Sequence, residues 1–156
     1  MIKQAKRVCL VLAVAALSGC GVGPDGGALS GSFDAPVGYQ KAYQSALAQT
    51  QLCLLANGAY RIDSQLDSAT RTGRLRVVGS LFGRKEAARV ELTAINDTHT
   101  RVQVDMWGRR DWDASAMRAM RDAVVYSVAS CRSYMPQPND EWFRPQQPQQ
   151  QAPQQK

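Results

Sequence analysis

The sequence contains one histidine, His99, and no apolar run longer than ten residues. Because no cysteine or acidic cluster surrounds His99, the residue does not predict a zinc site. No serine lies in a nucleophile-elbow sequence, and neither G-x-G-x-x-G nor a P-loop motif occurs. Asp111 and Asp113 are better explained as turn and helix-cap residues than as a general acid–base pair. We therefore expect no catalytic residue, no metal site, no cofactor and no enzymatic activity.

The sequence also lacks a large excess of charge of one sign. The formal net charge is +6, but three of the basic residues lie in the first seven positions. Removing these three from the 19 Lys and Arg leaves 16 against 13 Asp and Glu, a net +3. This small excess is weak support for an anionic partner. The hydrophobic content of 44% is sufficient for a folded core.

The amino-terminal region predicts a secretion signal. Residues 1–7 are basic without an acid, and the ten residues 8–17 (VCLVLAVAAL) are all apolar. Because a helix needs about 20 apolar residues to span a bilayer, this pattern favours a signal peptide over a membrane span. The sequence that follows resembles the lipobox of bacterial lipoproteins: Leu17-Ser18-Gly19-Cys20.

The lipoprotein resemblance implies cleavage of a signal peptide, residues 1–19, and a diacylglycerol on the Cys20 sulfur. It also implies further acylation, for example with palmitate, since one acyl chain gives only marginal membrane binding. Gly21 follows where Asp would retain an enterobacterial lipoprotein in the inner membrane. The resemblance therefore implies a cell-envelope protein anchored to the outer membrane and facing the periplasm. An ordinary signal peptide with an incidental cysteine is the alternative.

Two of the four cysteines remain after this assignment. Cys9 belongs to the signal peptide and Cys20 is the lipid site, which leaves Cys53 and Cys131. An even pair in an oxidising compartment predicts one disulfide bond. Two buried free thiols are the alternative interpretation.

The rest of the chain divides into three regions. Residues 20–36 comprise the lipidated Cys20 and a Gly/Ser/Pro-rich stretch, which predicts a flexible tether with an r.m.s. reach of about 20 Å. Residues 37–135 have the apolar periodicity of a folded domain. Residues 136–156 are rich in Pro and Gln and predict a disordered, extended tail. The tail's Trp142 and Phe143 either dock onto a protein partner or fold back onto the domain.

Apolar spacing predicts the elements of the domain. Spacings of three and four residues predict a helix over 37–57 and a second helix, capped by Asp113, that ends near Tyr134. Between them, alternation with a period of two predicts up to four short strands joined by turns, and hence an antiparallel meander. The expected fold is a two-layer α+β domain with a three- to four-stranded sheet and both helices on one face. This pattern is similar to small periplasmic lipoprotein domains of unknown function and implies no chemistry.

The disulfide conflicts with a sheet of four full strands. An odd number of strands makes the two helices parallel and places Cys53 and Cys131 at the same end. Four strands make the helices antiparallel and separate the cysteines well beyond the Cα limit of about 7 Å. Either the first strand is irregular, or the helices cross steeply, or the disulfide does not form.

Four arginines fall on the exposed face of the predicted sheet: Arg74, Arg76, Arg89 and Arg101. Because the guanidinium group binds phosphate and carboxylate bidentately, this face is a candidate site for an anionic glycan or lipid. The alternative is a solvated face with cross-strand ion pairs, each contributing about 0.2–1 kcal/mol. The predicted location argues against nucleic acid as a partner. We therefore expect a structural or protein-interaction role with an envelope protein partner, and an anion-binding module is the second hypothesis.

Overall fold

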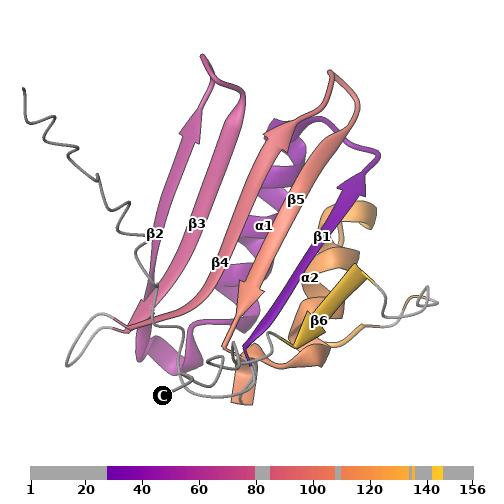
Figure 1. The fold of residues 1–156 in the computed structure, drawn as a ribbon. Helices are drawn as coiled ribbons and strands as arrows, with labels where there is room; N and C mark the ends of the chain where they lie inside the picture. Colours follow the sequence, from indigo (N-terminus) through magenta and orange to yellow (C-terminus); the bar gives the residue numbers. More distant parts are fainter. Residues whose placement is uncertain (1–27, 80–84, 108–109, 134, 136–141, 146–156) are drawn as a thin grey trace, which may run out of the picture.

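The computed structural model describes residues 28–79, 85–107, 110–133, 135 and 142–145, which form an α+β fold. The elements in chain order are β1 (Leu29–Ala35), α1 (Tyr39–Cys53), the 3-10 turn η1 (Ala56–Gly58), β2 (Tyr60–Asp67), β3 (Thr72–Gly79), β4 (Glu86–Ala94), β5 (Thr100–Met106), the 3-10 turn η2 (Arg110–Trp112), α2 (Ala114–Tyr126) and β6 (Phe143–Pro145). All strands join one antiparallel sheet in the order β2-β3-β4-β5-β1-β6 (Figure 1).

The predicted antiparallel meander is confirmed as β2 to β5, in which consecutive strands are neighbours. Its alternating apolar residues face the core because successive side chains of a strand point to opposite faces. The buried set is Leu75, Val77, Ala88, Val90, Leu92, Val102, Val104 and Met106. The predicted count of three to four strands is wrong, however, because β1 and the short β6 extend the sheet beyond β5.

The predicted tether is wrong over its last part, since residues 29–35 form β1. This strand pairs with β5 along its whole length, from Leu29 opposite Met106 to Ala35 opposite Thr100. The sequence of β1 is rich in small residues and has no apolar periodicity, but the edge of β5 provides hydrogen-bond partners for its backbone. Leu29 and Ala35 are both buried, so β1 belongs to the folded domain.

The predicted domain boundary at residue 135 is also wrong, because β6 pairs with the first half of β1. Phe143 is buried, and the Trp142 ring packs edge-on against Phe33 with 5.2 Å between ring centroids. A Cβ atom at Gly31 would collide with the Phe143 Cβ, so glycine permits the close approach of β6. Of the two interpretations of these aromatics, the structure shows folding back onto the domain.

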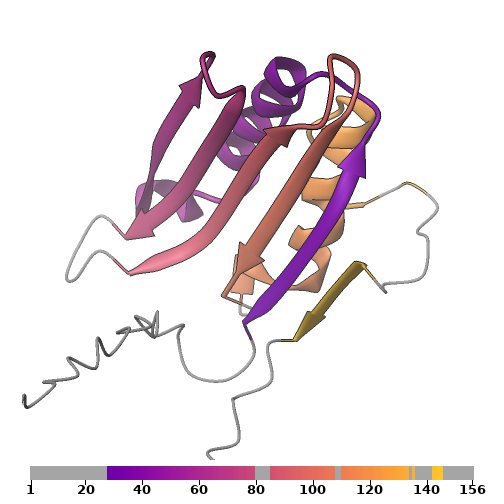
Figure 2. The same cartoon turned by 45° about the horizontal axis from the view of Figure 1, so that its top comes forward.

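The two helices lie on the same side of the sheet in both views (Figures 1 and 2). α1 packs against β3 and β4, while α2 packs against α1 and β1. The core between the layers includes the fully buried Leu54, Trp112, Met117 and Met120. None of the helices in the described ranges is long and apolar enough to cross a membrane.

Candidate interaction surfaces and the disulfide

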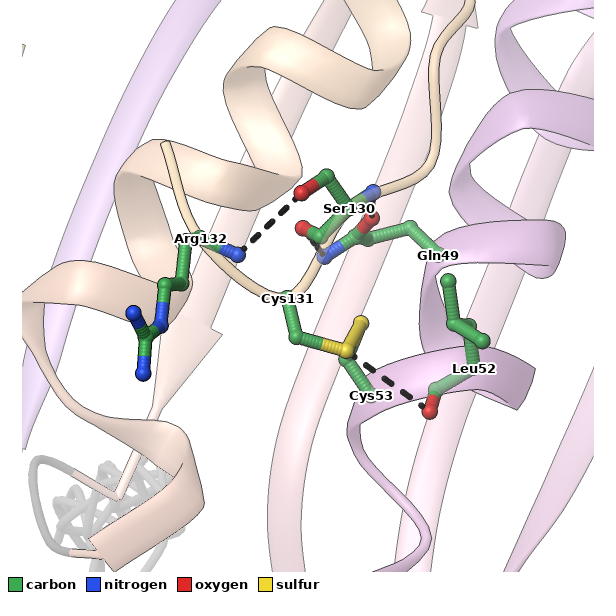
Figure 3. Close-up of a disulfide and its surroundings, with 6 residues drawn as sticks. All are labelled: Gln49, Leu52, Cys53, Ser130, Cys131 and Arg132. Carbon is green, nitrogen blue, oxygen red and sulfur yellow. Dashed lines mark hydrogen bonds between the residues drawn. A yellow bond between two sulfur atoms is a disulfide. The ribbon is translucent and has the colours of Figure 1, made fainter. Parts of the chain in front are cut away.

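The end of α2 lies earlier in the chain than sequence periodicity predicts. The helix ends at Tyr126, eight residues before the predicted end at Tyr134. Its C-cap, Ser127, adopts the left-handed conformation with φ 58° and ψ 33°. Because a left-handed residue ends a helix and redirects the chain, residues 127–133 leave α2 and pass beside α1 (Figure 3). We call residues 127–133 the return segment.

The return segment carries Cys131 to the end of α1. Cys53 and Cys131 form a disulfide in the structure, with their Cα atoms 5.2 Å apart (Figure 3). In the chain, four full strands lie between α1 and α2, and the two helices run in opposite directions (Figure 1). The expected conflict is therefore resolved in none of the three ways proposed. Cys131 is not a helical residue, and the return segment covers the distance that antiparallel helices would impose.

Two buried polar side chains hold the return segment in place. The Gln49 amide is 1% exposed and donates to the Ser130 carbonyl oxygen at 2.9 Å, while the Ser130 N–H donates to Gln49 Oε1 at 2.8 Å. Asp122 on α2 is also buried, and its carboxylate accepts a hydrogen bond from the Ser133 hydroxyl. The segment is thus attached to both helices on either side of the disulfide.

Replacing Gln49 with alanine is expected to lower the free energy of unfolding by about 2–4 kcal/mol. The change removes a fully buried side chain and leaves the N–H and carbonyl groups of the partly buried Ser130 without their side-chain partner, where an unpaired buried polar group costs about 1–3 kcal/mol. Urea unfolding of the two proteins measures the difference. Gln44 lies on the exposed face of the same helix, so Gln44→Ala is the matched control. Equal stabilities of the two variants would contradict this role of Gln49.

The four candidate arginines lie on one face of the sheet, and each is paired with a carboxylate. Arg74 Nε lies 3.0 Å from Glu91 Oε1, whereas Arg76 and Arg89 share Glu86, each at 2.6 Å. Arg101 binds both oxygens of Asp34, at 2.8 and 3.0 Å. The ion pairs of this face are thus Arg74–Glu91, Arg76–Glu86, Arg89–Glu86 and Arg101–Asp34.

The paired carboxylates reduce the positive field of this face. The hydrogen bond from Arg101 holds the pKa of Asp34 below its usual range, so the Asp34 carboxylate is ionised at neutral pH. Asp105 lies opposite Arg89 in the register and adds a further negative charge to the face. An anionic ligand would therefore have to displace carboxylates that already bind the guanidinium groups. This arrangement favours the solvated ion-pair interpretation over a preformed anion site.

A pocket at the start of α1 and the single histidine are two further polar features, and neither involves the four candidate arginines. The pocket, of about 420 Å³, lies at the start of α1, where Arg71 pairs with Asp97 at 2.6 Å and lies over the Tyr39 ring. His99 follows the turn between β4 and β5, and its Nδ1 lies 3.0 Å from the Thr98 hydroxyl. Within the described ranges, no three His, Cys, Asp or Glu residues gather in a way that would hold a metal ion.

Sequence reasoning missed the residues that position these surfaces. Glu86 stands at the start of β4 and Asp34 lies in the segment interpreted as a tether, so neither was assigned to an arginine. Gln49 was assigned to the polar side of its helix; its spacing of seven residues from Ala42 and three from Ala46, both of which are buried, is what places it on the buried face. Cys20, the candidate lipid site, lies outside the described residues.

Comparisons with known proteins add no assignment: no family model, curated protein or solved structure matches the chain.

Proposed function

We propose that the protein is a non-enzymatic lipoprotein of the cell envelope, anchored through Cys20, whose domain has a structural or protein-interaction role. The observation that carries this proposal is the sequence Leu17-Ser18-Gly19-Cys20, placed directly after a basic start and ten apolar residues. A short apolar run of this kind suits a cleaved signal peptide. Several acyl chains on the new amino-terminal residue would then supply stable membrane attachment.

Two properties of the domain are consistent with this role. A disulfide between Cys53 and Cys131 suits an oxidising compartment such as the periplasm. β1 begins nine residues after Cys20, and a chain of that length spans at most about 30 Å when fully extended. The anchor would therefore hold the start of β1 within about 30 Å of the membrane surface.

Replacing Cys20 with alanine is expected to abolish incorporation of radiolabelled palmitate and to release the protein from the membrane fraction of a bacterial host. The reason is that Cys20 supplies the sulfur that receives the first lipid. Labelling of immunoprecipitated protein, together with fractionation of the host cells, measures both effects.

Cys9→Ala is the matched control for this experiment, because Cys9 is the other cysteine before the domain. This variant is expected to incorporate palmitate as the unaltered chain does. If the unaltered chain takes up no palmitate, or if the Cys20→Ala variant still does, the lipoprotein proposal is wrong.

A further inference from the structure

β2 is an open edge of the sheet. It stands first in the strand order, so its outer side has no neighbouring strand among the described residues (Figure 1). Its eight residues pair with β3 without a break, from Tyr60 opposite Gly79 to Asp67 opposite Thr72. The strand contains neither a proline nor a bulge, which are two of the devices that prevent edge strands from pairing. The edge therefore presents a regular row of backbone donors and acceptors.

The side chains of β2 are complementary to those of a second β2 strand. An antiparallel pair centred on Ser64 places Arg61 opposite Asp67, Ile62 opposite Leu66 and Asp63 opposite Gln65. Two-fold symmetry repeats each of these pairs, as in an isologous interface. The result is two opposite-charge pairs on one face of the joined sheets and two apolar pairs on the other. In the single chain Arg61 Nε lies 3.3 Å from Asp63 Oδ1, but both side chains are about half exposed, so Arg61 can exchange this weak ion pair for Asp67 of the second copy.

The exposure of these residues agrees with this arrangement. Leu66 is 41% exposed although it belongs to the helix side of the sheet, and Ile62 is only partly buried. Ser64, at the centre, is small and exposed, so two strands can approach closely there. The Asp67 carboxylate accepts hydrogen bonds from the Ala69 and Thr70 N–H groups, which fix it at the end of the strand.

Neighbouring registers fit less well. Centring the pair on Asp63 would place its carboxylate directly opposite the same group of the second copy, and like charges at that position are unfavourable. Centring it on Ile62 would pair only residues 60–64 and would leave Leu66 uncovered. The registers centred on Ser64 and on Asp63 each pair seven residues of β2, and of these two only the Ser64 register is complementary in charge.

We infer that β2 binds the β2 strand of a second copy of this chain, antiparallel and about a two-fold axis at Ser64, so that the two sheets become continuous. The inference uses only the domain's edge and does not depend on the lipid anchor. It assigns a self-association surface at the end of the sheet opposite to β1 and β6.

Cysteine cross-linking in cells that express the full chain tests this register. Directly opposed residues of antiparallel strands have Cα atoms about 4.5–5.5 Å apart, within reach of a disulfide. Ser64→Cys is therefore expected to give a dimer on non-reducing electrophoresis after mild oxidation. Ser68→Cys is the matched control, because Ser68 is exposed on the same hairpin but would lie more than about 20 Å from its symmetry mate. The unaltered chain reports any cross-link formed through Cys9 or Cys20.

A charge reversal in the Ser64→Cys background provides the second measurement. Arg61→Glu turns both Arg61–Asp67 pairs into like-charge pairs and is expected to weaken association about tenfold. Lys41→Glu makes the same change in charge at an exposed position of α1 and is expected to leave the dimer yield unchanged.

The inference is supported if Ser64→Cys forms a dimer joined through position 64, Ser68→Cys does not, and Arg61→Glu alone reduces the yield. Equal cross-linking of the two variants, or none of Ser64→Cys, overturns it. A cross-link from position 64 to a different protein also overturns the assignment of a second copy, and would show instead that this edge receives a foreign strand.

Discussion

Replacing Cys131 with serine is expected to lower the free energy of unfolding by about 4 kcal/mol. The disulfide joins residues that are 78 positions apart, and closing a loop of this length removes a large amount of conformational entropy from the unfolded chain. The loop-entropy relation gives about 4.5 kcal/mol for 78 residues, within the range of about 2–5 kcal/mol observed when native disulfides are removed. Urea unfolding of the unaltered and variant chains, both without reductant, measures the difference.

Removing Cys53, Cys131 or both cysteines breaks the same disulfide bond, so the three variants serve as controls for one another. Cys53→Ser and the double variant are expected to match Cys131→Ser, because removing the second partner of a broken bond adds little. Reductant is expected to destabilise the unaltered chain to a similar extent and to leave the double variant unchanged. Free thiols at both Cys53 and Cys131, found by alkylation and mass spectrometry of unreduced denatured protein, would show that the bond does not form.

Replacing Trp112 with alanine is the second large expected effect, at about 3–5 kcal/mol of unfolding free energy. Trp112 is 1% exposed and lies between Tyr60 and Trp107, with ring centroids 4.4 and 6.2 Å away. Truncation leaves a cavity between the start of β2 and η2 that these neighbours fill only in part. Thermal and urea unfolding measure the loss.

Trp112→Phe distinguishes lost packing from lost hydrogen bonding. The buried Trp112 Nε1–H has no hydrogen-bond partner among the described residues, so phenylalanine retains much of the ring contact and removes a donor that is costly to bury. We expect Trp112→Phe to cost well under half of the Trp112→Ala value. Equal losses in the two variants would show that the indole donor has a partner on which the fold depends.

The sequence was most informative where one face of a strand is buried and the other is exposed. Val90 and Leu92 alternate with polar residues along β4, as do Val102 and Val104 along β5, and both strands lie where alternation predicts them. β1 carries no such pattern, because serine and glycine occupy much of it and Phe33 is only partly buried. Its position depends on pairing with β5, which is a tertiary interaction that a local pattern does not encode.

The end of α2 could not be predicted for a related reason. Val124 and Val128 continue the helical spacing towards Cys131, but Val124 is fully buried and Val128 is 55% exposed. The helix ends between them at Ser127, a residue with a left-handed backbone at a position where glycine is the usual indication. The direction that the chain takes there depends on the tertiary contacts of the return segment with Gln49 and Asp122 and on the Cys53–Cys131 disulfide.

The arginine face shows how far sequence periodicity can predict a surface. Alternation correctly grouped Arg74, Arg76, Arg89 and Arg101 on one face, because that depends only on strand register. Which carboxylate each arginine contacts depends on neighbouring strands and, for Asp34, on a strand that was not predicted. Cross-strand ion pairs were one of the two interpretations of this face, but the partners Glu86 and Asp34 could not be named from the sequence.

The position of β1 also constrains the order in which the domain can assemble. β1 is the first of the described strands in the chain but the fifth across the sheet. Its Asp34 can form the ion pair with Arg101 only after the 67 residues up to Arg101 have been synthesised. In a chain that emerges amino end first, the local hairpins from β2 to β5 can close early, while β1 and α1 have no complete surface to join. Cys53 then remains an unpaired thiol until Cys131 has emerged, so during that interval it is open to mixed disulfides with other proteins.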